Sequence, residues 1–156
     1  MIDFNADIVS GHSIGNVFLN DDIGRYFSDM YSFHHVEVKE YYIPDGTKKN
    51  AYILDDTMKI VVSQDGIIFS IGCNQEYKGL YNTALHTGQT MSEIFKFTKK
   101  QRIFNGSIII DDDFGVSFVL PFPYDEIADT INDIPPDLVI NEVYVSDYSS
   151  WNPNAN

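Results

Sequence analysis

The sequence has little that would stabilise it outside a cell or anchor it in a membrane. Its 156 residues include one cysteine, Cys73, so no internal disulfide bond can form and nothing indicates an oxidising compartment. No stretch approaches the roughly 18 consecutive apolar residues of a membrane span. The first residues, MIDFNAD, lack the basic and apolar regions of a signal peptide. We therefore expect a cytoplasmic protein that contacts no membrane.

Positive charge is also scarce, and it is absent from the last third of the chain. Ten Lys and Arg stand against 23 Asp and Glu, which gives a formal net charge of −13, and no Lys or Arg follows Arg102. A field of this sign repels phosphate groups, so it disfavours binding to nucleic acid or to an anionic membrane. It attracts a basic protein and speeds the encounter, although an acidic balance is also a common means of staying soluble.

The sequence lacks a motif that specifies an enzyme, a metal centre or a cofactor site. Residues 11–15, GHSIG, match the G-x-S-x-G nucleophile motif of α/β-hydrolases, with Ser13 as the nucleophile. That fold needs several strands before the motif and a helix after it, whereas ten residues precede Gly11 and the following NVFL predicts an extended segment. Residues 111–122 miss the calcium-loop pattern, because glycine is fifth and Phe122 is twelfth. We expect no catalysis, metal or cofactor, with a small serine hydrolase as an alternative.

Apolar residues follow two kinds of spacing along the chain, one typical of helices and one typical of strands. Residues 21–31 carry apolar side chains at the spacing of one helical face, and a second such helix follows Thr90, which pairs with Glu93 as a capping box. Residues 58–71 alternate apolar and polar side chains around an Asp-Gly turn, the strongest local signal for a hairpin. Further strands are predicted at 36–43, 51–54, 107–120 as a hairpin, and 138–147, with a third short helix at 124–131.

These elements predict an α+β fold, with antiparallel sheets of hairpins and two or three short amphipathic helices. The order of helix and then strands occurs twice, and residues 51–62 align without gaps on residues 107–118. The aligned segments, AYILDDTMKIVV and SIIIDDDFGVSF, are a candidate internal repeat, although any hairpin with an acidic turn would look similar. We expect one domain over residues 1–148 and a frayed polar tail over residues 149–156.

The opening of the chain resembles the immunity proteins that bacteria encode beside contact-dependent growth-inhibition and other polymorphic toxins. The resemblance rests on residues 13–31, SIGNVFLNDDIGRYFSDMY, in which an Ile-Gly-x-Val-x-Leu segment leads into a short amphipathic helix, and on size and acidity. The helix-and-hairpin arrangement is also similar to modules of the outer-membrane assembly lipoproteins and of β-lactamase inhibitor proteins. This chain departs from both in lacking a signal peptide.

The immunity resemblance implies a stoichiometric inhibitor that covers a toxin domain in the cytoplasm, often a basic nuclease. Carboxylates that imitate phosphates would give fast, salt-sensitive association, and aromatic anchors would slow dissociation. An acidic adaptor or assembly module is the remaining alternative. The expected partner-binding residues are acidic side chains and aromatic anchors, namely Asp111, Asp112, Asp113, Asp55, Asp56, Asp125, Glu126, Tyr41, Tyr42 and Trp151.

Overall fold

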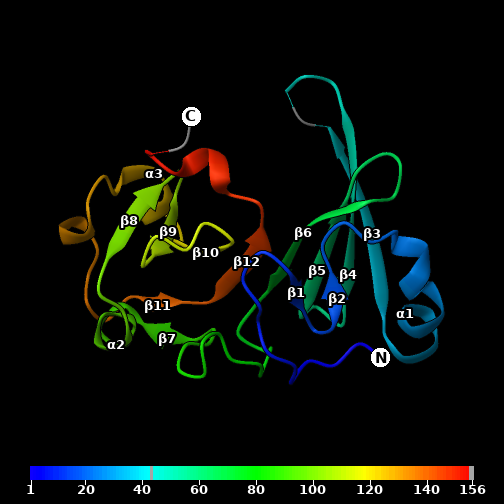
Figure 1. Ribbon diagram of the computed structural model, residues 1–156, viewed down its shortest axis with the longest axis horizontal. Helices are drawn as coiled ribbons and strands as arrows, with labels where there is room; N and C mark the ends of the chain where they lie inside the picture. Colours follow the sequence, from blue (N-terminus) through cyan, green and yellow to red (C-terminus); the bar gives the residue numbers. More distant parts are fainter. Residues whose placement is uncertain (43, 155–156) are drawn as a thin grey trace.

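The computed structural model describes residues 1–42 and 44–154 and confirms the α+β class. Its centre is one antiparallel sheet of eight strands, with short helices towards both ends of the sheet (Figure 1). The spatial order of the strands is β3-β4-β5-β6-β12-β10-β9-β8. Their bounds are β3 Val36–Tyr42, β4 Lys48–Leu54, β5 Met58–Val62, β6 Ile68–Cys73, β8 Gln101–Phe104, β9 Ser107–Ile110, β10 Val116–Val119 and β12 Glu142–Ser146.

Smaller elements complete the chain. Two two-stranded sheets accompany the large one, formed by β1 with β2 and by β7 with β11. The short strands are β1 Ser13–Ile14, β2 Val17–Phe18, β7 Gln89–Thr90 and β11 Val139–Ile140. The helices are α1 Phe27–Phe33, α2 Met91–Phe97 and α3 Tyr124–Ile127, and three 3-10 turns lie at Ile23–Tyr26, Ile131–Asp133 and Ser149–Trp151.

The helix predicted at residues 21–31 forms in two parts. A 3-10 turn covers Ile23–Tyr26, and α1 follows directly at Phe27–Phe33. Three of the four predicted apolar positions face the core, because Ile23 and Met30 are buried and Tyr26 is partly buried against them, whereas Phe27 is 36% exposed. The apolar spacing therefore located most of the buried face, although Phe27 lies outside it and the helix starts later than predicted.

The second predicted helix begins where its cap indicates. α2 covers Met91–Phe97, and Oγ1 of Thr90 accepts a hydrogen bond from the backbone N–H of Glu93 at 3.2 Å. This bond satisfies one of the amide groups left open at a helix start. Met91 and Ile94 are fully buried, so the helix packs its predicted face against the sheet.

Two stretches in the second half of the chain differ from the sequence-based prediction. Residues 101–104, which no apolar alternation marked, form the edge strand β8. The single strand predicted at 138–147 is divided into β11 and β12, with Asn141 between them. The division arises because β11 pairs with β7, whereas β12 inserts into the large sheet between β6 and β10.

The end of the chain also differs from the prediction. The third helix is a single turn, α3, with a separate 3-10 turn at Ile131–Asp133. The tail expected to fray from residue 149 forms a 3-10 turn at Ser149–Trp151. The reason is aromatic packing, because the Trp151 ring stacks on Phe104 with their centroids 4.8 Å apart.

The large sheet consists of two halves with the same order of elements. α1 precedes β3 to β6, α2 precedes β8, β9, β10 and β12, and the pairing of β6 with β12 joins the halves. The segments aligned above, 51–62 and 107–118, each contain a turn at two aspartates with φ between 50° and 54°, at residues 55–56 and 111–112. The pairing beyond the turns differs by two residues, because Ala51 pairs with Val61 whereas Ser107 pairs with Val119. The repeated sequence pattern thus coincides with a repeated backbone geometry at the two turns.

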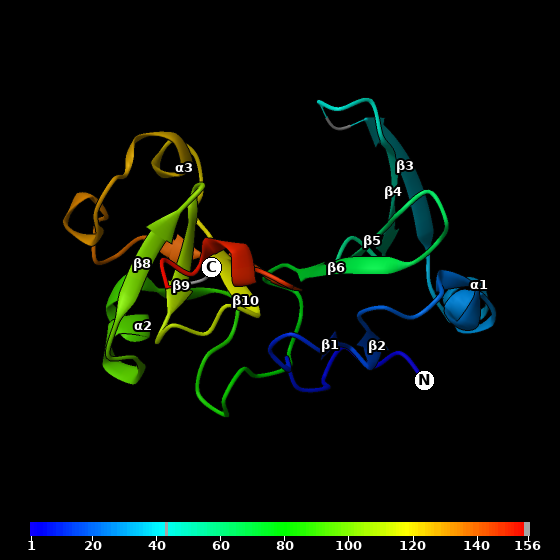
Figure 2. The same cartoon turned by 45° about the horizontal axis from the view of Figure 1, so that its top comes forward.

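The two faces of the large sheet are covered differently. α1, α2 and the β1–β2 hairpin pack on one face and enclose a continuous core that includes Met30, Ile60 and Val145 (Figure 2). The C-terminal 3-10 turn and the residue before it lie on the opposite face, over β8 and β10, where Trp151 stacks on Phe104 and Tyr148 contacts Ser117. The remainder of that opposite face is what we call the open face.

Candidate partner-binding surfaces

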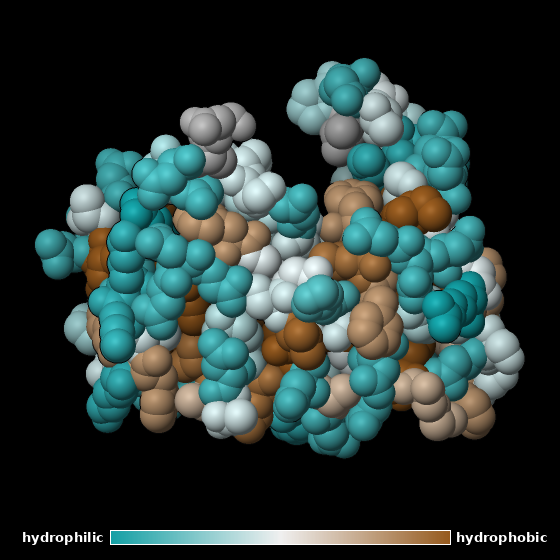
Figure 3. Space-filling model, viewed as in Figure 1, coloured by the Kyte–Doolittle hydropathy of each residue, from teal (hydrophilic) through white to brown (hydrophobic). Residues whose placement is uncertain are grey.

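Small and polar residues occupy the centre of the open face. Gly72 on β6 lies between its cross-strand partners Lys59 on β5 and Tyr144 on β12, and Tyr144 is in turn beside Ser117 on β10. The Ser117 hydroxyl donates to the Tyr148 hydroxyl at 3.0 Å. The hairpin of β3 and β4 stands at one side of this floor, and Figure 3 shows a notch in the surface between that hairpin and the part containing β8 and α3.

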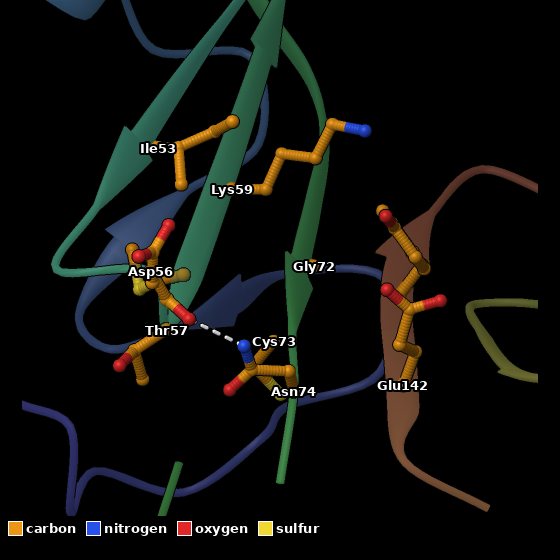
Figure 4. Close-up of a pocket in the computed structure, with 10 residues that line it drawn as sticks. Ile53, Asp56, Thr57, Lys59, Gly72, Cys73, Asn74 and Glu142 are labelled. Atoms are coloured by element: carbon orange, nitrogen blue, oxygen red, sulfur yellow. Dashed lines mark hydrogen bonds between the residues drawn. The ribbon is translucent and has the colours of Figure 1, made fainter. Parts of the chain in front are cut away.

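A cavity of about 220 Å³ opens at one end of this floor. Lys59, Glu142 and Tyr144 contribute an ammonium, a carboxylate and a phenol to its lining, and Asn74 donates to the backbone carbonyl of Asp56 at its rim (Figure 4). Burial raises the pKa of Tyr144 to about 12, so the phenol stays protonated at neutral pH. Because the cavity is smaller than the roughly 300–1,000 Å³ of ligand pockets, it fits one side chain of a partner better than a metabolite.

The predicted acidic turn at residues 111–113 is bonded within the chain. Asp111 accepts hydrogen bonds from the backbone N–H groups of Lys99 and Lys100, at 2.7 and 2.9 Å. Asp112 is paired with Arg102 at 2.7 Å and with Lys100 at 2.9 Å, and these bonds hold the pKa of its carboxyl below the usual value. These two carboxylates therefore serve the fold of the β9–β10 hairpin and face cations of the chain itself.

Asp113, the third aspartate of the turn, is hydrogen-bonded to two distant segments of the chain. Its carboxylate accepts hydrogen bonds from the hydroxyls of Ser10 and Tyr81. Burial and the bond to Asp113 raise the pKa of Tyr81, so that the phenol remains a donor. Both partners come from segments far away in the sequence, so this bond ties two loops to the hairpin.

The other predicted acidic turn shows the same pattern in part. Asp55 accepts a hydrogen bond from the backbone N–H of His35 at 2.8 Å and contacts Nδ1 of His34 at 2.6 Å. It thus holds the start of β3 as Asp111 holds the start of β8. Asp56 is exposed at the rim of the cavity, where its backbone carbonyl accepts from Asn74.

The predicted aromatic anchors lie at two different places. Tyr41 and Tyr42 are at the outer end of β3, where 38% and 68% of their surfaces are exposed. Trp151 is half-buried between Phe104 and Tyr148, with ring centroids 4.8 and 4.4 Å away. The tyrosines are therefore available to a partner, whereas the indole is largely used to fasten the C-terminal turn.

Asp125 and Glu126 belong to a continuous acidic segment, residues 121–137, which we call the acidic loop. The loop contains no Lys or Arg. All five of its carboxylates are exposed, and none takes part in an ion pair within the described chain. They are Asp125, Glu126, Asp129, Asp133 and Asp137. The acidic surface predicted from the sequence is therefore concentrated here and not at the two hairpin turns.

The acidic loop also exposes apolar side chains that the sequence analysis did not select. Phe122 is 76% exposed and Ile127 is 61% exposed. The loop is nevertheless fastened to the fold, because Ile134 is buried in the core and Asp125 packs its backbone against Gly106. A Cβ atom at position 106 would lie 2.7 Å from the carbonyl oxygen of Asp125, so glycine permits this close approach. Two apolar side chains are thus held out to solvent among carboxylates.

The GHSIG segment does not have the geometry that the lipase motif requires. Ser13 is 5% exposed and lies on β1, and the chain continues into β2 through a turn at Gly15 instead of a helix. Among the described residues, no group of three or more His, Cys, Asp and Glu side chains is placed to hold a metal ion.

No helix of the described chain combines the length and apolar character needed to cross a membrane. Comparison of the sequence with protein-family models, and of the chain with curated proteins and solved structures, finds no match.

Proposed function

We propose that the chain is a stoichiometric inhibitor of the toxin-immunity type, which binds a basic toxin domain through the acidic loop. The observation that carries this proposal is the combination of exposed Phe122 and Ile127 with five exposed carboxylates on one loop that is fastened to the large sheet. One of the five, Asp133, accepts hydrogen bonds from the backbone N–H groups of Asp129 and Thr130, both at 3.0 Å, and no such bond engages the other four within the described chain. Large apolar anchors enclosed by a polar rim are typical of protein interfaces. A basic nuclease cleft that receives phosphates offers the complementary charge.

The two kinds of side chain have separable roles in this proposal. The carboxylates at Asp125, Glu126 and Asp129 accelerate the encounter with a cationic partner, and this effect weakens as salt screens the charges. Phe122 and Ile127 become buried in the complex and slow its dissociation. We place the inhibitor in the cytoplasm, which agrees with a chain whose one cysteine cannot form an internal disulfide.

The test mixes the purified chain with the toxin-like domain encoded beside its gene and measures both toxin activity and association kinetics. We expect a one-to-one complex that abolishes activity, with an association rate that falls as salt is added. Reversal of two loop charges, D125K with E126K, should lower the association rate about tenfold or more at low salt. Truncation of the anchors, F122A with I127A, should raise the dissociation rate about tenfold or more.

Matched variants outside the loop provide the controls. E76K reverses an exposed carboxylate on the turn after β6, and F33A truncates a 65% exposed aromatic at the end of α1. Both should inhibit the toxin as the unmodified chain does. Full toxin activity in the presence of excess protein, or loop variants that inhibit as well as the controls, would rule the proposal out.

A further inference from the structure

The strand β3 leaves one edge of the large sheet unpaired. In the described chain β3 pairs with β4 alone, and six of its seven residues are exposed. The opposite edge, β8, is four residues long and lies beside the 3-10 turn of the acidic loop. An exposed edge strand presents a row of backbone N–H and C=O groups that can pair with another strand.

The charges of β3 distinguish between the possible registers of self-pairing. Glu37, Lys39 and Tyr41 point to the open face, and Val36, Val38 and Glu40 point to the other face. Antiparallel pairing of two identical strands places residues of the same face opposite each other. If the two-fold axis that relates the copies passes through Lys39, the Lys39 residues of the two copies face each other. If the axis passes through Glu40, the two Glu40 residues face each other. An axis through Val38 sets Glu37 of each copy opposite Lys39 of the other. Lys39 and Glu37 are already paired at 3.8 Å within one strand, so this register joins two exposed ion pairs into a cluster of four alternating charges.

Exposed apolar side chains lie beside the same point of β3. Val38 is 47% exposed, and its cross-strand partner is Tyr52. The Tyr52 ring lies 5.7 Å from that of Phe27, which in turn lies 5.8 Å from that of Tyr31, a residue with 58% of its surface exposed. A second copy related by an axis through Val38 would bring the two apolar patches together and remove part of them from water.

We propose that β3 pairs antiparallel with β3 of a second copy of this chain, about an axis through Val38. The two sheets of eight strands then form one continuous sheet of sixteen (8 + 8). The net charge of −13 on each copy opposes association, but at 0.15 M salt charges more than about 8 Å apart are largely screened. The acidic loop lies at the other end of the sheet, so this inference is independent of the proposed function.

Disulfide trapping tests the axis directly. Directly opposed residues of antiparallel strands have Cα atoms about 4.5–5.5 Å apart, within the roughly 4.4–6.8 Å that a disulfide bridges. V38C should therefore form a covalent dimer rapidly under mild oxidation, while the buried Cys73 stays free. The control is Y42C, whose two copies would be about 27 Å apart in this register, from eight residues at about 3.4 Å each. A V38C chain that oxidises no faster than Y42C overturns the proposal.

Charge exchange tests the register without a cysteine. Sedimentation equilibrium at 0.15 M salt should show a reversible dimer for the unmodified chain. E37K or K39E alone should weaken the dimer affinity about tenfold, because residues 37 and 39 of opposite copies then carry the same charge at two places. The double variant E37K/K39E should restore the dimer, because it exchanges the charges and keeps the pairing. Circular dichroism checks that each variant is folded. The proposal is overturned if the unmodified chain is monomeric at every concentration or if the single variants dimerise as it does. It is also overturned if the double variant dimerises no better than the single variants.

Discussion

The ring of Tyr144 lies directly across Gly72, its cross-strand partner at the junction between β6 and β12. A Cβ atom on residue 72 would lie 2.3 Å from Cε1 of Tyr144. The pairing of β6 with β12 is the one that joins the two halves of the large sheet. The glycine therefore permits the ring to lie flat on the strand where the halves meet, as aromatic side chains do over glycines in other sheets.

Replacement of this glycine should loosen the junction. G72A forces the Tyr144 ring away from the strand, and we expect the free energy of unfolding to fall by about 1–3 kcal/mol, as for other overpacked sites. In a Y144S background the same replacement should cost much less, because the ring that the new methyl meets is gone. Urea unfolding of the unmodified chain, the two single variants and the double variant completes a double-mutant cycle, which measures the coupling between residues 72 and 144. If G72A lowers the free energy of unfolding equally in both backgrounds, the contact between the Tyr144 ring and residue 72 is not the cause.

The two neighbouring aspartates of the β9–β10 turn should differ sharply in their effect on stability. Both have positive φ, 50° at Asp111 and 54° at Asp112, so glycine is the replacement that adds no backbone strain. D111G removes the acceptor for the N–H groups of Lys99 and Lys100 and should cost about 1–2 kcal/mol. D112G removes an exposed ion pair and should change stability little. Thermal or urea unfolding checks this contrast, and equal losses for both variants would contradict it.

Acid should destabilise the protein partly through Asp55. Partial burial raises the pKa of this carboxyl, but the bonds from His34 and from the N–H of His35 outweigh it and leave the pKa below its usual 3.8. A folded pKa below the unfolded one gives stability that is present at neutral pH and is lost as the pH falls below 3.8. D55N, which tolerates the φ of 51°, should lose less stability than the unmodified chain between pH 7 and pH 3. Urea unfolding at both pH values decides this, and equal losses would show that Asp55 has no part in it.

Local patterns in the sequence predicted much of the fold. The Asp65-Gly66 hairpin and the Thr90 cap depend on neighbouring residues, and both elements form where expected. The edge strand β8 was missed because its residues are half-exposed and show no alternation. The division at Asn141 was missed because it depends on β11 finding β7, some fifty residues earlier in the chain. Pairings between distant segments leave no local signal.

The candidate site was predicted less well, for a similar reason. The turn at residues 111–113 is acidic in sequence, but its ion pairs and hydrogen bonds involve Ser10, Tyr81, Lys100 and Arg102, which the sequence alone does not place beside it. Phe122 and Ile127 were overlooked because apolar residues are expected in a core. The signal that marks them is their position among prolines and carboxylates, which leaves them no apolar face to join.

Cys73 should report on the opening of the junction between the two halves of the sheet. Cys73 is 4% exposed, and its cross-strand partners are Met58 on β5 and Val143 on β12. Burial raises its pKa to about 12, so very little reactive thiolate exists in the closed state. Reaction with an aromatic disulfide reagent at pH 8 must then await opening, and a cost of about 4 kcal/mol would slow it about a thousandfold relative to the unfolded chain. G72A should accelerate the reaction, whereas F33A, far from the junction, should leave it unchanged. A native thiol that reacts as fast as the unfolded one would contradict the buried position of Cys73.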